Sequence, residues 1–169
     1  PGGEPISTPG RLAVRISLVM PTWNGARTLP EVLAALARQR LPLAEKVAVD
    51  SGSRDETVTL LAAAGFQVHS IPGREFDHGA TRDLGISLTG GEIVVLLVQD
   101  ALPAADSFLE ALTAPFAADP WLAGCYGRQR PRPGANPILA ERLRHWNASR
   151  GEPVIQEASE AELARLARP

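Results

Sequence analysis

The chain has 169 residues and a mass of 18.0 kDa, which favours one domain, since most domains run about 100–150 residues. Its 44% hydrophobic and 21% charged residues are ordinary globular values and exclude wholesale disorder. A net charge of −2 argues against a nucleic-acid binder, which is normally basic. The single cysteine, Cys125, excludes an internal disulfide, and no Cys/His set has zinc spacing.

Neither a signal peptide nor a membrane-spanning segment is expected. The longest apolar run, residues 93–98, is far shorter than the about 20 residues that cross a bilayer, and no charged-then-apolar leader opens the chain. The first ten residues hold three prolines and three glycines and are expected to be flexible. We therefore expect a soluble protein of a reducing compartment.

Strand-like and helix-like segments alternate along residues 14–100. Short apolar runs, typical of strands buried on both faces, lie at residues 16–20, 47–49, 66–71 and 93–98. The predicted helices follow the first three runs, and two of them are preceded by apparent capping boxes, Thr28 with Glu31 and Ser53 with Glu56. Gly65 is the expected C′ residue of the second helix. This alternation predicts an α/β domain with a mostly parallel sheet flanked by helices.

The alternation of strand-like and helix-like segments is less regular after residue 106. It predicts a helix near residues 108–116, a strand over 122–126 and a helix that begins with Asn136 as N-cap and Pro137 at N1. Leu139, Leu143 and Trp146 fall on one face of that helix. A further capping box, Ser159 with Glu162, predicts a short terminal helix.

Polar and ionisable residues gather where the predicted strands end, at residues 21–25, 50–53, 73–82 and 99–101. Ligands of open parallel sheets bind outside the carboxyl ends of the strands, so these segments are the candidate site. No Gly-x-Gly-x-x-Gly follows a strand, and no Gly-Lys-Ser/Thr occurs. A dehydrogenase-type dinucleotide site is therefore disfavoured, and a P-loop is excluded.

The main candidate residues each allow a structural and a functional interpretation. Asp50 can cap the turn after its strand, or it can accept an N–H of a pyrimidine base. Asp100 can order a turn, or it can be an oxygen ligand of Mg²⁺ or Mn²⁺ on a diphosphate. Arg82 can pair with Asp83 or Glu75, or its guanidinium can bind phosphate.

Four segments, in this order and spacing, resemble the inverting GT-A glycosyltransferases of family 2. They are Leu-Val-Met-Pro-Thr-Trp-Asn at 18–24, Val-Asp-Ser-Gly-Ser-Arg-Asp-Glu-Thr at 49–57, Gly-Ala-Thr-Arg-Asp-Leu-Gly at 79–85 and Leu-Leu-Val-Gln-Asp-Ala at 96–101. Residues 76–82, 99–103, 126–129 and 135–138 are similar to the rhamnosyltransferase-like branch. Val98 stands where the metal motif has its first acid, and Asp83 where the helix motif has asparagine.

The resemblance implies a GT-A, Rossmann-like fold and transfer, with inversion, of a sugar from a UDP- or dTDP-linked donor to a saccharide or lipid-linked acceptor. Asp50 would hold the base, Arg82 would face the diphosphate, and Asp100 would bind Mg²⁺ or Mn²⁺. The implied nucleotide-sugar-binding residues are Pro21, Thr22, Asn24, Asp50, Gly52, Arg82, Gln99 and Asp100.

The resemblance also implies that the catalytic base lies downstream of the matched segments, so we expect the N-terminal, donor-binding half of an enzyme of polysaccharide biosynthesis. We expect a lead-in over 1–13, a nucleotide-sugar-binding core over 14–127 and a partial, helical acceptor-side segment over 128–169. A non-catalytic nucleotide-sugar-binding module and a sugar-1-phosphate nucleotidyltransferase stay open as alternatives. The expected location is cytoplasmic; peripheral attachment to the inner face of the membrane and a homodimer are further options.

Overall fold

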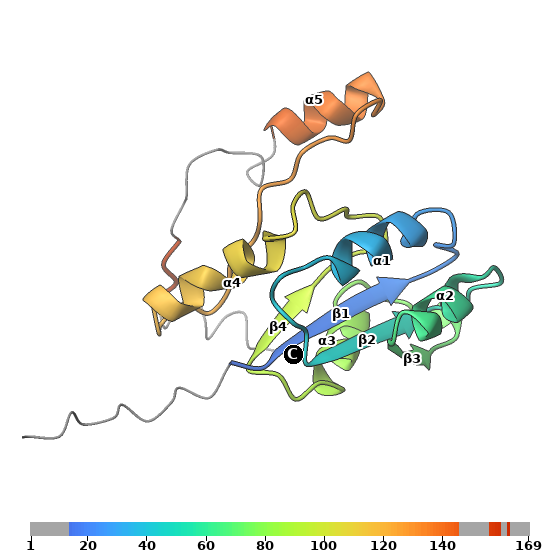
Figure 1. Cartoon of the computed structure of the whole chain (residues 1–169), viewed down its shortest axis with the longest axis horizontal. Coiled ribbons are helices and arrows are strands. Elements are labelled where there is room, and N and C mark those ends of the chain that lie inside the picture. Colours follow the sequence, from blue (N-terminus) through green and yellow to red (C-terminus); the bar gives the residue numbers. More distant parts are fainter. Residues whose placement is uncertain (1–13, 146–155, 160–161, 163–169) are drawn as a thin grey trace, which may run out of the picture. The chain divides into compact units, whose positions relative to one another are not determined.

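The computed structural model describes residues 14–145, 156–159 and 162 (Figure 1). One four-stranded sheet forms its centre, in the order β3-β2-β1-β4, and every strand pair is parallel. The strands are β1 (Ile16–Thr22), β2 (Glu45–Asp50), β3 (Gln67–Ser70) and β4 (Ile93–Leu96). The predicted parallel sheet is confirmed, with the third and fourth strands shorter than expected.

A helix follows each of the first three strands, and the last two helices follow β4 in the chain. They are α1 (Leu29–Ala37), α2 (Thr57–Ala63), α3 (Ala80–Ser87), α4 (Phe108–Ala118) and α5 (Pro137–His145), with a short 3₁₀ helix at Gly73–Glu75. The chain divides into a first compact unit that ends at Trp121 and a second that begins at Leu122. The first unit holds the whole sheet and the helices α1 to α4.

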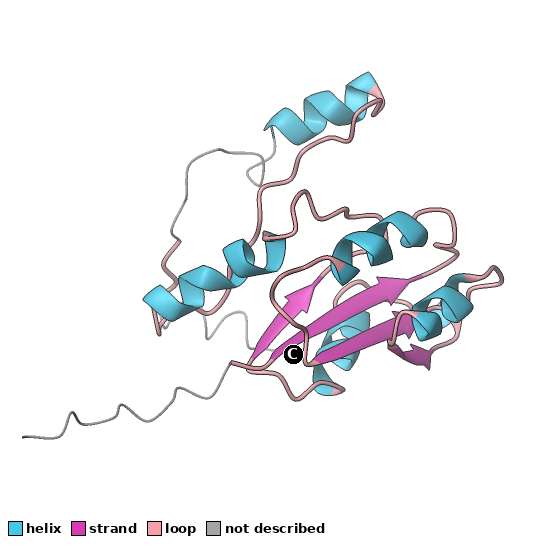
Figure 2. Ribbon diagram, viewed as in Figure 1, coloured by secondary structure: helices cyan, strands magenta, loops and turns pink. Residues whose placement is uncertain are grey.

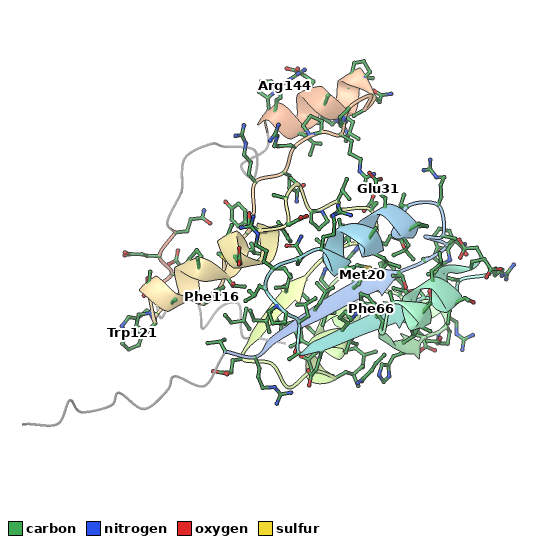
Figure 3. All side chains as sticks on the ribbon, viewed as in Figure 1. Met20, Glu31, Phe66, Phe116, Trp121 and Arg144 are labelled. Atoms are coloured by element: carbon green, nitrogen blue, oxygen red, sulfur yellow. The ribbon has the colours of Figure 1, made fainter. Side chains whose placement is uncertain are left out.

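Successive side chains of a strand point to opposite faces, and this alternation builds two layers on the sheet. Leu18 and Met20 belong to one apolar cluster with Leu29 of α1 and Leu61 of α2 (Figure 3). Val19, between them, is 1% exposed and faces α3 instead. Helices α1 and α2 therefore cover one face of the sheet, and α3 covers the other (Figure 2).

Helix α3 approaches the sheet closely because one of its residues is glycine. A Cβ built on Gly85 would lie 2.3 Å from Cγ1 of Val19 and 3.4 Å from Cγ2 of Val49. Real Cβ atoms do not approach other heavy atoms to 2.3 Å, so only glycine fits this contact. The last glycine of the segment 79–85 thus has a packing reason.

The capping boxes predicted for the first two helices are wrong, because neither Thr28 nor Ser53 makes the capping hydrogen bond. Thr28 occupies the N-cap of α1, but its hydroxyl donates to the Gly25 carbonyl at 3.2 Å and caps nothing. Helix α2 begins only at Thr57, and the Ser53 hydroxyl binds Asp50. Each side chain binds a group three residues earlier in its own loop, and such local hydrogen bonds compete with helix capping. Gly65, with φ of +79°, is the left-handed residue predicted after α2.

The later predictions met mixed outcomes. Residues 122–126 form neither helix nor strand, so the strand predicted there was wrong. The N-cap at Asn136 is confirmed, because its Oδ1 accepts the Ile138 N–H at 2.8 Å. Ser159 and Glu162 make the hydrogen bonds of a capping box, but most of the helix predicted after them, like Trp146, lies outside the described residues. None of the helices in the described part of the chain is long and apolar enough to cross a membrane.

Candidate functional site

The loops that follow β1, β2 and β4 meet at the carboxyl edge of the sheet. Strand order 3-2-1-4 places the topological switch point between β1 and β4, where open α/β sheets form their ligand crevice. Pro21 and Thr22 end β1, opposite Val49 and Asp50 of β2 in the parallel register. The Ser51 N–H donates to the Thr22 carbonyl at 2.9 Å and extends this pairing into the loops.

Asp50 lies at the floor of this edge and is 1% exposed. Its Oδ1 accepts hydrogen bonds from the hydroxyls of Thr22 (3.1 Å) and Ser53 (2.5 Å). Its Oδ2 accepts the backbone N–H groups of Gly52 (3.1 Å) and Ser53 (2.9 Å). A carboxylate offers about four acceptor positions, and the chain itself supplies four donors here. Asp50 therefore fixes the loop after β2, including Gly52 with its φ of +81°.

The β1 loop is fastened to the β2 loop by its backbone. The N–H groups of Asn24, Gly25 and Ala26 donate to Ser53 Oγ, Thr57 Oγ1 and Asp55 Oδ2, at 2.8, 2.7 and 3.1 Å. The Asn24 side chain returns the contact, since its Oδ1 accepts the Arg54 N–H at 2.8 Å. Asn24 has a φ of 45°, a conformation that asparagine tolerates better than most residues. The polar residues of segment 49–57 thus join two loops into one unit.

Asp55 is part of this fastening, and its hydrogen bonds lower its pKa. The hydroxyl of Thr57 is the largest cause, and the N–H groups of Ala26 and Thr57 add to it. Thr57 is fully buried and makes two of these links, because its Oγ1 donates to Asp55 and accepts from Gly25. Asp55 and Thr57 of the segment therefore join the two loops.

Ser51 holds an unsatisfied polar atom at the same edge. It is 3% exposed, and its Oγ is the buried side-chain N or O atom without a hydrogen-bond partner among the described residues. An unpaired buried hydroxyl destabilises a fold by about 1–3 kcal/mol, so its presence calls for an explanation. Ser51 follows β2 directly, so this atom belongs to the buried part of the strand-end loops.

Trp23 and Gln99 connect the loops of β1 and β4. The carboxamide of Gln99 accepts the Trp23 N–H at 2.9 Å and donates to the Trp23 carbonyl at 3.0 Å. The Trp23 indole remains 62% exposed beside these fixed backbone groups. Trp23, Ser51, Asp55 and Thr57 were not among the predicted site residues, although all four lie in the segments 18–24 and 49–57 that carried the resemblance.

Arg82 lies in the first turn of α3 and is half-buried. Its Nη1 donates to the His78 carbonyl, and neither Asp83 nor Glu75 pairs with it among the described residues. Asp77 caps the same helix, because its Oδ1 accepts the N–H groups of Gly79 and Ala80, both at 2.9 Å. These backbone hydrogen bonds, with Ala80 first, lower the pKa of Asp77.

The lowered pKa of Asp77 predicts a pH-dependent stability of this helix. A carboxyl whose pKa is lower in the folded state stabilises the fold above its unfolded pKa and loses that effect as the pH falls through its folded pKa. Asp77→Ala should therefore lower the unfolding midpoint at pH 7, and the difference from the native chain should shrink below about pH 4. Urea unfolding between pH 7 and pH 3 measures this, and a difference that stays constant would contradict it.

The metal candidate, Asp100, follows β4 in an exposed turn. The described residues contain no group of three or more His, Cys, Asp or Glu side chains that could hold an ion by themselves. One carboxylate still fits Mg²⁺ or Mn²⁺ that takes its other ligands from a diphosphate and water. The single carboxylate of Asp100 therefore suits a metal ion that binds together with a nucleotide, and it does not suit a tight metal site in the free chain.

Comparisons with known proteins identify relatives of this chain. The family described as Glycosyl transferase family 2 matches residues 17–156. The chain is 34% identical over 155 residues to the O-antigen chain rhamnosyltransferase RfbN of Salmonella typhimurium, over 90% of this chain and 48% of that protein. The chain thus spans about half the length of the curated relatives it matches.

Solved structures share the fold. The crystal structure of S. aureus TarS 1–349 is 23% identical, with a TM-score of 0.57, over 70% of this chain and 38% of that one. Glucosyl-3-phosphoglycerate synthase from Mycobacterium tuberculosis, in complex with Mn²⁺, UDP and glucosyl-3-phosphoglycerate, is 25% identical with a TM-score of 0.52. That match covers 69% of this chain and 46% of the synthase. The predicted GT-A fold is confirmed.

Proposed function

Because this chain belongs to glycosyl transferase family 2, we propose that its strand-end loops hold the nucleoside diphosphate of an activated sugar, the donor of an inverting glycosyl transfer. The observation that carries the proposal is the joining of three loops, after β1, β2 and β4, into one hydrogen-bonded edge at the switch point. That edge is where open α/β sheets bind nucleotides. The Mycobacterium tuberculosis synthase, which shares this fold, forms a complex with UDP and Mn²⁺.

In this proposal a pyrimidine base lies over the loop after β2. Asp50 keeps that loop in shape through its four hydrogen bonds. Gly52 is exposed and has no side chain to block the approach. Thr22 and Asn24 frame the nucleoside from the β1 loop, next to Pro21.

The diphosphate would lie toward Asp100 and Arg82. A guanidinium matches phosphate oxygens in shape and charge, and the half-buried Arg82 is held near the start of α3 by its bond to His78. Asp100 would hold Mg²⁺ or Mn²⁺ together with diphosphate oxygens. Such an ion, when bound, neutralises charge on the departing diphosphate.

The acids of these loops do not supply a catalytic base in this proposal. Asp50, Asp55 and Asp77 all accept hydrogen bonds from the chain, and Asp100 is assigned to the metal. We assign the base, and the saccharide or lipid-linked acceptor, to the part of the family that this chain does not span. Similarity to an O-antigen chain rhamnosyltransferase supports a donor such as a UDP- or dTDP-linked sugar and a role in polysaccharide biosynthesis at the cytoplasmic side of a membrane.

Calorimetric titration tests the proposal. UDP and dTDP should bind more tightly than ADP and GDP, Mn²⁺ should strengthen the binding, and Asp100→Asn should weaken that metal effect. Equal or purine-favouring affinities would contradict the proposal.

A further inference from the structure

The segment that carries Asp100 is tied to the β1 loop by one side chain. Gln99 lies 76 residues from Trp23 in sequence, yet both halves of its carboxamide are engaged with the Trp23 backbone, at 2.9 and 3.0 Å. The arrangement imitates a rung of a β-ladder beyond the end of β4, which stops at Leu96. The Gln99 side chain thus links the loops that follow β1 and β4, the two strands on either side of the switch point.

The packing around Gln99 shows that the bridge has little freedom. A Cβ on Gly25 would lie 2.5 Å from Oε1 and 2.8 Å from Cδ of Gln99. Gly25 cannot retreat easily, because its N–H is bound to the buried Thr57 hydroxyl and its carbonyl accepts from Thr28 and Leu29. The carboxamide of Gln99 is therefore enclosed between Trp23 and Gly25.

We propose that Gln99 is a positioning residue that couples the nucleoside part of the site to its metal and diphosphate part. The inference rests on the proposed function, since it takes the β1 loop to frame the nucleoside and Asp100 to hold the metal. Gln99 touches neither ligand in this scheme. Its bridge to Trp23 fixes the distance between Asp100, the next residue in the chain, and the loop that frames the base.

The consequence is a thermodynamic coupling between two ligands. A nucleotide that shifts the β1 loop shifts the Asp100 segment with it through the bridge, so the metal binds more tightly, and the converse holds by reciprocity. Without the bridge the two loops adjust independently. The factor by which Mn²⁺ raises UDP affinity, typically about 5–150 for coupled sites, should then fall, and only the part that comes from direct binding of the ion to the diphosphate should remain.

Gln99→Met tests this, because methionine keeps the length of the side chain and adds no charge near the metal. We expect the factor by which Mn²⁺ raises UDP affinity to fall at least fivefold, a change within the range of such couplings. UDP affinity in the absence of metal should change by less than about threefold. Gly25→Ala, which displaces the Gln99 carboxamide without altering it, should give the same loss of coupling.

Gln39→Met is the matched control. Gln39 also joins distant backbone groups, since it donates to the Ala105 carbonyl and accepts the Leu109 N–H, but it lies away from the strand-end loops. Gln39→Met should lower the unfolding midpoint and leave the Mn²⁺ effect intact. If Gln99 has a purely structural role, Gln99→Met and Gly25→Ala should also lower the unfolding midpoint and leave the Mn²⁺ effect intact. That result would overturn this inference and leave the proposed function standing. Absence of UDP binding to the native chain would overturn the proposed function and this inference together.

Discussion

Replacing Asp50 with alanine is expected to lower the free energy of unfolding by about 3 kcal/mol and to reduce nucleotide binding below detection. The carboxylate accepts four hydrogen bonds at a position that is 1% exposed. Alanine leaves the Thr22 hydroxyl, itself 3% exposed, without its acceptor, along with the N–H groups of Gly52 and Ser53. The loop that frames the base then loses its shape.

Urea unfolding followed by circular dichroism measures the stability effect, and calorimetry with UDP measures the binding effect. Glu110→Gln is the control, because Glu110 is an exposed carboxylate on α4, away from the strand-end loops. Asp50→Asn should fall between native and Asp50→Ala, since its amide oxygen can still accept hydroxyl hydrogen bonds while its NH₂ group opposes two backbone donors. An Asp50→Ala midpoint equal to that of the control would show that the four contacts carry little energy.

Gly85→Ala is expected to lower the free energy of unfolding by about 2 kcal/mol, although alanine favours helices over glycine by about 1 kcal/mol. The new methyl group would lie 2.3 Å from Cγ1 of Val19, which is 1% exposed in the central strand. Helix α3 must then move away from the sheet and carry Arg82 with it. We therefore expect weaker UDP binding together with the loss of stability.

Two comparisons separate this collision from a general effect of alanine. Gly124→Ala, where no heavy atom lies within 4 Å of the added Cβ, should leave stability unchanged. The double variant Val19→Ala, Gly85→Ala should lose less free energy of unfolding than the sum of the losses in the two single variants, because it removes the overlap. Equal midpoints for Gly85→Ala and Gly124→Ala would refute the packing explanation.

The sheet could be predicted because its information is local. The nearly continuous apolar run at residues 16–20 and the apolar run at 47–49 indicate strands buried on both faces, and the structure has them in β1 and β2. The helix starts were less predictable, because the Thr28 and Ser53 side chains bind Gly25 and Asp50 instead of capping. Each of these side chains has a second local partner three residues earlier, and the capping-box pattern does not indicate which of the two partners it binds.

The meeting of the polar strand-end segments at one edge of the sheet could be predicted from sequence, but the hydrogen bonds between their loops could not. The segments at strand ends had to meet once the sheet was parallel, which placed Asp50 and Asp100 at one edge. Nothing local indicates that Gln99 binds Trp23, 76 residues earlier in the chain, or that the Ser51 hydroxyl stays unpaired. Both facts depend on the exact approach of separate loops, which three-dimensional packing decides.

The central claim, that the strand-end loops bind the donor nucleotide, is tested most directly by amide ¹H–¹⁵N spectra of the chain titrated with UDP and Mg²⁺. The account predicts that shift changes concentrate at residues 22–25, 51–53 and 99–101, with little change at the opposite edge, where Glu45 joins Ser17 and Gly90. Shift changes centred on Glu45 and Gly90, or none at saturating UDP, would contradict it.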